Sequence, residues 1–311
     1  MAGSNETIVI DKRDLHVKLT EIFRSPVEGA GGTLPIAYSI EVAAKDDFDI
    51  EALERLSPQP ISCALPWISD ENLRYDADFQ CAPSFQLTER LQKAHYTVVN
   101  HVSCYNLTEE QADRLLAAGI QNVFIVRGDT VNPAQAFLHS AGLVKYLRQH
   151  ETHKLTIGVG GYPYGHHQSP SETDELRYLR EKIDCGVDFL LTQTLYDAES
   201  FFRYRDRCRQ AGISILTIPG IYLPHSYKHL QAMLNLTRIQ LPPSIRSMFD
   251  AHANDPQDQF EAFVIDYFER VVRGILAPGA ESSEPVRLVH FFSFNKFAML
   301  QKLLFKLIDF F

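Results

Sequence analysis

One glutamate, Glu41, lies inside an apolar run whose side chains would keep water away from it. Tyr-Ser-Ile precedes it and Val-Ala-Ala follows it. Burial disfavours the charged form of a carboxylic acid, so a buried glutamate keeps its proton and can donate it near neutral pH. The sequence therefore indicates a general acid at Glu41, and it leaves open a structural acid that caps a loop.

Charged residues follow a second apolar run as the triplet Arg127-Gly128-Asp129. The triplet fits either a functional pair of charges or a structural ion pair across a tight glycine turn. We do not expect an adhesion motif, because an intracellular strand end does not display one. His166 and His167 have no carboxylate at metal-ligand spacing, so we expect structural or ligand-contacting histidines and no metal site.

Short runs rich in apolar and β-branched residues recur eight times and predict the strands that position these groups. Most of the runs are continuously apolar, which is typical of parallel strands buried on both faces. They are Ile36–Val42, Ile61–Leu65, Thr97–Val102, Asn122–Val126, Leu155–Gly161, Phe189–Thr192, Ser214–Ile218 and Val286–Phe292.

Amphipathic helical segments separate the runs. Three of them begin at Thr108, Ser171 and Asp197, residues whose side chains cap helices, and each ends at a glycine. A preliminary helix is expected over Asp14–Arg24, and another within the long connection from Pro242 to Pro285, before the last strand.

Eight strand–helix units favour an α/β protein with a (β/α)₈ TIM barrel over an open sheet. No linker divides the chain, so we expect an N-terminal segment at 1–35 and one barrel catalytic domain at 36–311. Chemistry in such barrels occurs at the C-terminal strand ends. The predicted strands end at Glu41, His101-Val102-Ser103, Arg127-Gly128-Asp129, Gly161-Tyr162-Pro163, Gln193 and Pro219-Gly220.

The charge balance argues against a nucleic-acid partner. The 311 residues carry 30 Lys and Arg against 39 Asp and Glu, a formal net charge of −9, and no basic run. The five cysteines form no Cys-x-x-Cys pair, which favours a reducing compartment over a disulfide framework. The N-terminus is polar and no apolar stretch reaches about eighteen residues, so we expect a cytoplasmic protein without a membrane partner.

Six motifs carry a resemblance to a known family. They are HVSCYN at 101–106, IVRGD at 125–129, GYPYGH at 161–166, EKIDCGVDFLLTQTLYD at 181–197, PGIYLPHSYK at 219–228 and HFFSFNKFAM at 290–299. In this order and spacing the chain resembles the catalytic domain of methylenetetrahydrofolate reductase from about Tyr38 to Met299. The resemblance implies a flavoprotein of one-carbon and methionine metabolism. It would reduce 5,10-methylenetetrahydrofolate to 5-methyltetrahydrofolate with NADH or NADPH in a ping-pong cycle.

The resemblance also implies roles for single residues. Glu41 would be the general acid, and Asp129 a carboxylate near the pterin and the flavin ring. Gln193 and Tyr227 would contact the folate and the nicotinamide in turn, with Lys296 near the folate tail. Non-covalent FAD is implied at His101, Arg127, Gly128, Asp129, Tyr162, His166 and Lys182.

Three features depart from the family pattern. Val-Ala-Ala-Lys-Asp follows Glu41 where aromatic and proline residues are usual, Ala64 stands where a flavin-contacting Thr is usual, and Lys296 where an Arg is usual. The departures after Glu41 and at Ala64 leave open a catalytically impaired relative that acts as a binding or assembly partner. A Schiff-base aldolase built on Lys182 fits less well, because that lysine is expected on the helix before strand six. A homo-oligomer is compatible with the sequence.

Overall fold

Eight parallel strands close into a barrel in the computed structural model, which describes residues 36–45, 48–66, 82–276 and 285–310. Each strand pairs with the next along the chain, and the eighth pairs with the first. The strands are β1 Ala37–Glu41, β2 Cys63–Leu65, β3 Val98–Ser103, β4 Asn122–Val126, β5 Thr156–Gly161, β6 Phe189–Leu195, β7 Leu216–Tyr222 and β8 Leu288–Phe292. The predicted (β/α)₈ class is confirmed.

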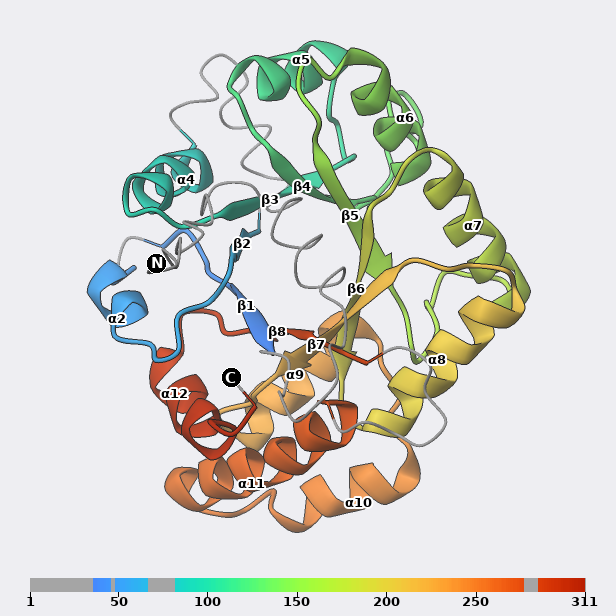
Figure 1. The fold of residues 1–311 in the computed structure, drawn as a ribbon. Coiled ribbons are helices and arrows are strands. Elements are labelled where there is room, and N and C mark those ends of the chain that lie inside the picture. The colour runs from blue at the N-terminus through green and yellow to red at the C-terminus, as the bar shows by residue number, and fades with distance from the viewer. Residues whose placement is uncertain (1–35, 46–47, 67–81, 277–284, 311) are drawn as a thin grey trace, which may run out of the picture.

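Helices surround the strands (Figure 1). They are α2 Ile50–Glu54, α4 Pro83–Lys93, α5 Glu109–Ala117, α6 Ser140–His150, α7 Glu172–Asp184, α8 Ala198–Gln210, α9 Tyr227–Thr237, α10 Pro243–Ala251, α11 Gln257–Leu276 and α12 Phe297–Lys306. The helix α11 confirms the one expected before strand eight. The helix expected over Asp14–Arg24 lies outside the described residues. No helix within the described ranges is long and apolar enough to cross a membrane.

The predicted helix caps are present. Thr108 Oγ1 accepts a hydrogen bond from Gln111 N at 3.1 Å, and Gln111 Oε1 accepts one from Thr108 N at 3.0 Å. This reciprocal pair satisfies two main-chain donors at the start of α5. Ser171 and Asp197 cap α7 and α8 with their side chains. These caps fix where each helix leaves the loop that follows the preceding strand.

The apolar residues of the strands divide between the inside and the outside of the barrel, as continuous runs require. Those inside are Ala64, Val99, Phe124, Phe189, Leu191, Ile218 and Leu288. Those outside pack against the helices in two larger clusters. The interior is therefore a packed core, as in other (β/α)₈ barrels, whose ligands bind at the C-terminal ends of the strands.

Two strands run further than predicted. β6 continues to Leu195 and β7 to Tyr222, so Gln193 and Gly220 lie within strands and not at their ends. The register between β6 and β7 shifts before Thr194, which then pairs with Gly220. Main-chain hydrogen bonds continue a strand through residues that interrupt its apolar run, here Gln193 in β6 and Pro219-Gly220 in β7, so the end of the run underestimates the length of the strand.

Candidate active site

A neutral acid lies at the end of β1. Glu41 is the last residue of that strand and is 5% exposed, and burial raises the pKa of its carboxyl from 4.5 to about 8. His101 on β3 places Nδ1 4.0 Å from Glu41 Oε2, and burial lowers its pKa to about 4. Both groups are therefore neutral near pH 7, and their contact is not an ion pair. Glu41 can thus act as a proton donor at neutral pH.

A second buried histidine, His290 on β8, lies further inside the barrel. Its Nδ1 is 2.9 Å from the Oγ of Ser39, and burial lowers its pKa to about 3. Within the described part of the chain, neither His290 Nε2 nor His101 Nε2 has a hydrogen-bond partner. Both histidines line an interior cavity of about 20 Å³, a volume that accommodates one water molecule. Ser39 and the two histidines therefore place polar groups in an otherwise apolar interior beneath Glu41.

Sequence reasoning missed Ser39 and His290 because each lies inside a run interpreted as a buried strand. A signal was available for Ser39. Side chains two apart on a strand share a face, so Ser39 had to point to the same side as Glu41. His290 was a polar residue in an otherwise apolar strand, which the hydrophobic pattern does not require.

Charged and aromatic residues gather at the ends of β4 and β5. The rings of Tyr162 and His166 are edge to face, with centroids 4.5 Å apart. The Arg127 guanidinium hydrogen-bonds the side-chain oxygen of Gln168, whose Nε2 donates to the main-chain O of Asp129 at 3.5 Å. The structure therefore brings together four of the residues predicted to bind the cofactor.

The same region holds two cationic side chains, Arg127 and Lys182. Burial lowers the pKa of Lys182 on α7, and Arg127 lowers it further, while Glu175 raises it. Burial also lowers the pKa of His166 to about 4, assisted by His167, Arg127 and Lys182. His166 N donates to Glu175 Oε2 at 2.8 Å. A bound anion would relieve the crowding of positive charge, so the donor set suits a phosphate group.

The turn between Arg127 and Asp129 requires a glycine. Gly128 has a φ of +86°, and a Cβ there would lie 3.1 Å from Ser103 Oγ and 3.3 Å from Tyr105 Cβ. A side chain here would be strained at this φ and would crowd the residues that end β3. Within the described ranges, no three His, Cys, Asp or Glu side chains gather as metal ligands.

Three predicted substrate residues lie apart from these groups. Gln193 is half-buried on β6. Tyr227 begins α9, and its hydroxyl donates to Asp250 Oδ1 at 2.5 Å and accepts from Arg246 Nη2 at 3.3 Å. Lys296 is exposed at the N-cap of α12. All three follow the C-terminal ends of strands or lie close to them, but no contact joins Tyr227 to Glu41 or Arg127.

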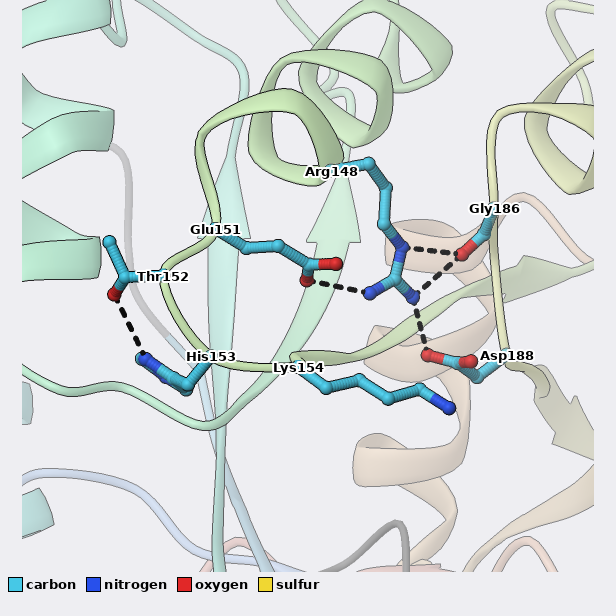
Figure 2. Close-up of a pocket in the computed structure, with 7 residues that line it drawn as sticks. All are labelled: Arg148, Glu151, Thr152, His153, Lys154, Gly186 and Asp188. Carbon is cyan, nitrogen blue, oxygen red and sulfur yellow. Dashed lines mark hydrogen bonds and ion pairs between the residues drawn. The ribbon is translucent and has the colours of Figure 1, made fainter.

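A hollow of about 540 Å³ lies at the opposite end of the barrel (Figure 2). It is lined by residues that precede β5 and β6, namely Arg148, Glu151, Thr152, His153, Lys154, Gly186 and Asp188. The Arg148 guanidinium lies between the carboxylates of Glu151 and Asp188 and bonds both of them. The active sites of (β/α)₈ enzymes lie at the C-terminal ends of the strands. We therefore assign this hollow, at the N-terminal ends, a structural role.

The sequence profile described as methylenetetrahydrofolate reductase matches residues 78–307. The chain belongs to the methylenetetrahydrofolate reductase family. A 5,10-methylenetetrahydrofolate reductase of Pectobacterium carotovorum subsp. carotovorum is 33% identical over 162 residues, 50% of this chain and 54% of that protein. Methylenetetrahydrofolate reductase (NADH) 1 of Arabidopsis thaliana is 27% identical over 254 residues, 75% of this chain and 42% of that protein.

A probable methylenetetrahydrofolate reductase (NADPH) of Caenorhabditis elegans is 26% identical over 213 residues, 66% of this chain and 31% of that protein. The chain thus spans about a third to a half of the length of these relatives. Among solved structures, an uncharacterized protein from Clostridium thermocellum that binds two copies of 5-methyl-5,6,7,8-tetrahydrofolic acid has a TM-score of 0.57 and 13% identity. The match covers 88% of this chain and 96% of that one, and it supports the fold alone.

Proposed function

We propose that this member of the methylenetetrahydrofolate reductase family reduces 5,10-methylenetetrahydrofolate to 5-methyltetrahydrofolate, with FAD bound non-covalently and NADH or NADPH as the electron donor. The observation that carries the proposal is Glu41, a buried carboxylic acid that keeps its proton at neutral pH at the ligand-accessible end of the barrel. Family membership supplies the substrate class, and the names of the relatives include both nicotinamide donors.

The residues near Arg127 fit FAD. Arg127 and Lys182 are cations that suit a diphosphate, and the edge-to-face rings of Tyr162 and His166 lie beside them. When bound, FAD would supply the carrier that accepts and returns two electrons and a proton. His101, Arg127, Gly128, Asp129, Tyr162, His166 and Lys182 would hold it.

Glu41 would give its proton to a folate nitrogen as the methylene bridge opens, because its carboxyl is protonated at neutral pH. Gln193 presents an amide that can bond either the pterin or a nicotinamide carboxamide. The side chain of Asp129 is exposed at the strand end. There its carboxylate can accept hydrogen bonds from the pterin.

Purified protein provides the test of this function. We expect bound flavin that acid precipitation releases into the supernatant, and oxidation of NADH or NADPH that depends on added methylenetetrahydrofolate. Colour retained in the precipitate would contradict non-covalent binding. Folate binding without reduction would instead support the binding or assembly partner.

Asp129→Asn is expected to lower the turnover of methylenetetrahydrofolate about 10- to 100-fold, because a charge-assisted hydrogen bond is worth about 1.5–3 kcal/mol. Flavin retention should change little, since the other proposed FAD residues remain. The measurement compares kcat/KM for the folate with the flavin content. Asp184→Asn, at the end of α7 and exposed, is the matched control. Unchanged folate kinetics in Asp129→Asn would place that carboxylate outside the site.

A further inference from the structure

β1 and β8 pair where the barrel closes, and this line of pairing is called the seam below. Side chains continue the contact between the two strands beyond their last main-chain pair. The last paired residues are Glu41 and Phe292. Past them, Ser293 Oγ donates to the main-chain O of Glu41 at 2.6 Å, and both residues are buried. The next contact along the seam comes from Asn295, so the two strands stay joined on the C-terminal side of the proposed acid.

The amide of Asn295 takes the place of a peptide group. Its Oδ1 accepts from Ala43 N at 2.9 Å, and its Nδ2 donates to Ala43 O at 3.0 Å. An amide supplies one acceptor and two donors, whereas a carboxylate can only accept. Asparagine is therefore the short side chain that can satisfy both main-chain groups two residues after Glu41.

The turn that carries Asn295 is strained. Phe294 and Asn295 have φ values of +45° and +64°, and Lys296 N closes the turn by donating to Ser293 O at 2.8 Å. Asparagine tolerates this region, but a phenylalanine does so only at a cost of about 1–3 kcal/mol. The Phe294 ring packs edge to face on Tyr222, with centroids 5.7 Å apart. Such strain persists where surrounding contacts fix the backbone, and it is concentrated at functional sites.

We propose that Asn295 is a positioning residue for Glu41, which closes the β1–β8 seam beyond its last main-chain pair and so keeps water away from the Glu41 carboxyl. The proposal rests on the role given to Glu41 above. The side chain of Asn295 bonds Ala43 and not the Glu41 carboxyl. It acts through Ala43 and the main chain of β1.

Burial alone accounts for the raised pKa of Glu41. The titratable group that faces it is His101 from β3, which is neutral; Ala64, opposite it on β2, carries no charge. On β8, His290 is bonded to Ser39 and is also neutral. Since none of these described neighbours is charged, entry of water along the seam should move the pKa of Glu41 back toward 4.5.

The expected loss of rate follows from the fraction of Glu41 carboxyl groups that are protonated. A pKa of about 8 leaves about nine-tenths of Glu41 protonated at pH 7, and a pKa of about 6 would leave about one-tenth. Opening the seam should therefore reduce the rate of folate reduction about tenfold at pH 7. The rate should recover as the pH is lowered through the new pKa.

Two variants and a matched control test the proposal. Asn295→Gly removes both bonds to Ala43 and accepts the positive φ without strain, while Asn295→Asp keeps an acceptor but loses the donor. Gln301 makes the same bidentate contact elsewhere, with Oε1 accepting from Ser57 N at 2.8 Å and Nε2 donating to Ser57 O at 2.9 Å. Gln301→Glu therefore repeats the loss of an amide donor far from Glu41.

The measurements are the pH dependence of kcat and the titration of the Glu41 carboxyl by infrared difference spectroscopy against Glu41→Gln. We expect the Glu41 band to ionise at lower pH in Asn295→Gly but not in Gln301→Glu, with a matching shift of the rate profile. Asn295→Asp should show a smaller shift, because its added carboxylate disfavours ionisation of Glu41. An unchanged titration in Asn295→Gly, or an equal shift in Gln301→Glu, would overturn the proposal. Because the infrared band reports without turnover, a wild-type protein that fails to reduce folate would refute the proposed function separately.

Discussion

Glu41→Gln is expected to slow reoxidation of the bound flavin by methylenetetrahydrofolate about 10²–10⁴-fold, the usual contribution of a general acid. An amide keeps the shape of the side chain but has no proton to give to the folate nitrogen. Reduction of the flavin by NADH or NADPH needs no proton donor at the nicotinamide, so this half should stay close to wild type. Stopped-flow absorbance measures the two halves separately.

The pH dependence provides a second signature of Glu41. The acid works only while protonated, so in wild type the folate half should be flat below about pH 7. Above a pKa of about 8 it should fall about tenfold per pH unit. The residual rate in Glu41→Gln should lack this fall, because the amide does not titrate.

Glu41→Gln should lower activity but gain stability relative to wild type as the pH is raised. The folded-state pKa of Glu41 is raised from 4.5 to about 8, so between these values the folded protein holds a proton that the unfolded chain has lost. Wild type therefore loses up to about 1.4 kcal/mol of stability per pH unit across this window, and Glu41→Gln does not. Its melting temperature should gain on wild type as the pH is raised from about 5 to about 8.

A purely structural Glu41 would behave differently. Both half-reactions would slow together, and the melting temperature or the flavin content would fall. Glu89→Gln on α4 serves as the control, because its carboxylate is an exposed partner of Lys93 at 3.7 Å. Equal slowing of both halves in Glu41→Gln would therefore remove the general-acid assignment.

The sequence allowed the barrel and the proposed acid to be predicted, because both leave a local signal. A carboxylate within an apolar run is unusual, so Glu41 could be selected without knowing its neighbours. Strand–helix alternation likewise repeats along the chain, and parallel strands place their C-terminal ends on one face. That rule was enough to expect His101 and Arg127 at the same end of the barrel as Glu41.

Contacts across the closing seam could not be predicted from local patterns. Ser39 and His290 are 251 residues apart, and Ala43 and Asn295 are 252 apart. The register that sets them opposite each other depends on the closure of the whole barrel and not on either strand alone. The partner of Tyr227, Asp250 on α10, depends in the same way on how two helices pack.

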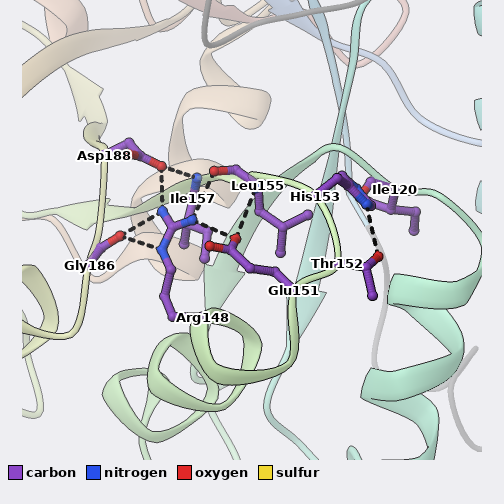
Figure 3. Close-up of polar contacts among 9 residues, drawn as sticks. All are labelled: Ile120, Arg148, Glu151, Thr152, His153, Leu155, Ile157, Gly186 and Asp188. Carbon is purple, nitrogen blue, oxygen red and sulfur yellow. Dashed lines mark hydrogen bonds and ion pairs between the residues drawn. The ribbon is translucent and has the colours of Figure 1, made fainter.

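Arg148→Met is expected to lower the free energy of unfolding by about 2–4 kcal/mol and to leave the chemistry of the folded protein unchanged. Arg148 bonds Gly186 O through Nε and Nη2 at 2.9 and 2.7 Å, and Leu155 O through Nη1 at 2.9 Å. It also pairs with Glu151 at 2.9 Å and with Asp188 at 2.6 Å (Figure 3). One guanidinium thus joins the end of α6 to the segments that enter β5 and β6.

Removal of the guanidinium would leave two carboxylates without their cation. The side chains of Glu151 and Asp188 are 21% and 22% exposed, so water compensates only in part, and the loss should be somewhat below that of a fully buried pair. Each carboxylate keeps one main-chain donor, Leu155 N and Ile157 N respectively. These remaining bonds hold the strand starts in place, so the variant should fold.

Arg177→Met is the matched control, because Arg177 also pairs with two carboxylates, Asp174 and Glu181, but is 54% exposed. Exposed pairs contribute little, so this variant should lose less than about 1 kcal/mol. Urea unfolding measures the free energy of unfolding of both variants, provided that the m-value is the same as in wild type. An equal loss of free energy of unfolding in Arg148→Met and Arg177→Met would show that the contacts of Arg148 contribute no more than exposed ion pairs. If it instead lost folate turnover while fully folded, the hollow at this end of the barrel would contribute to activity and its structural assignment would be wrong.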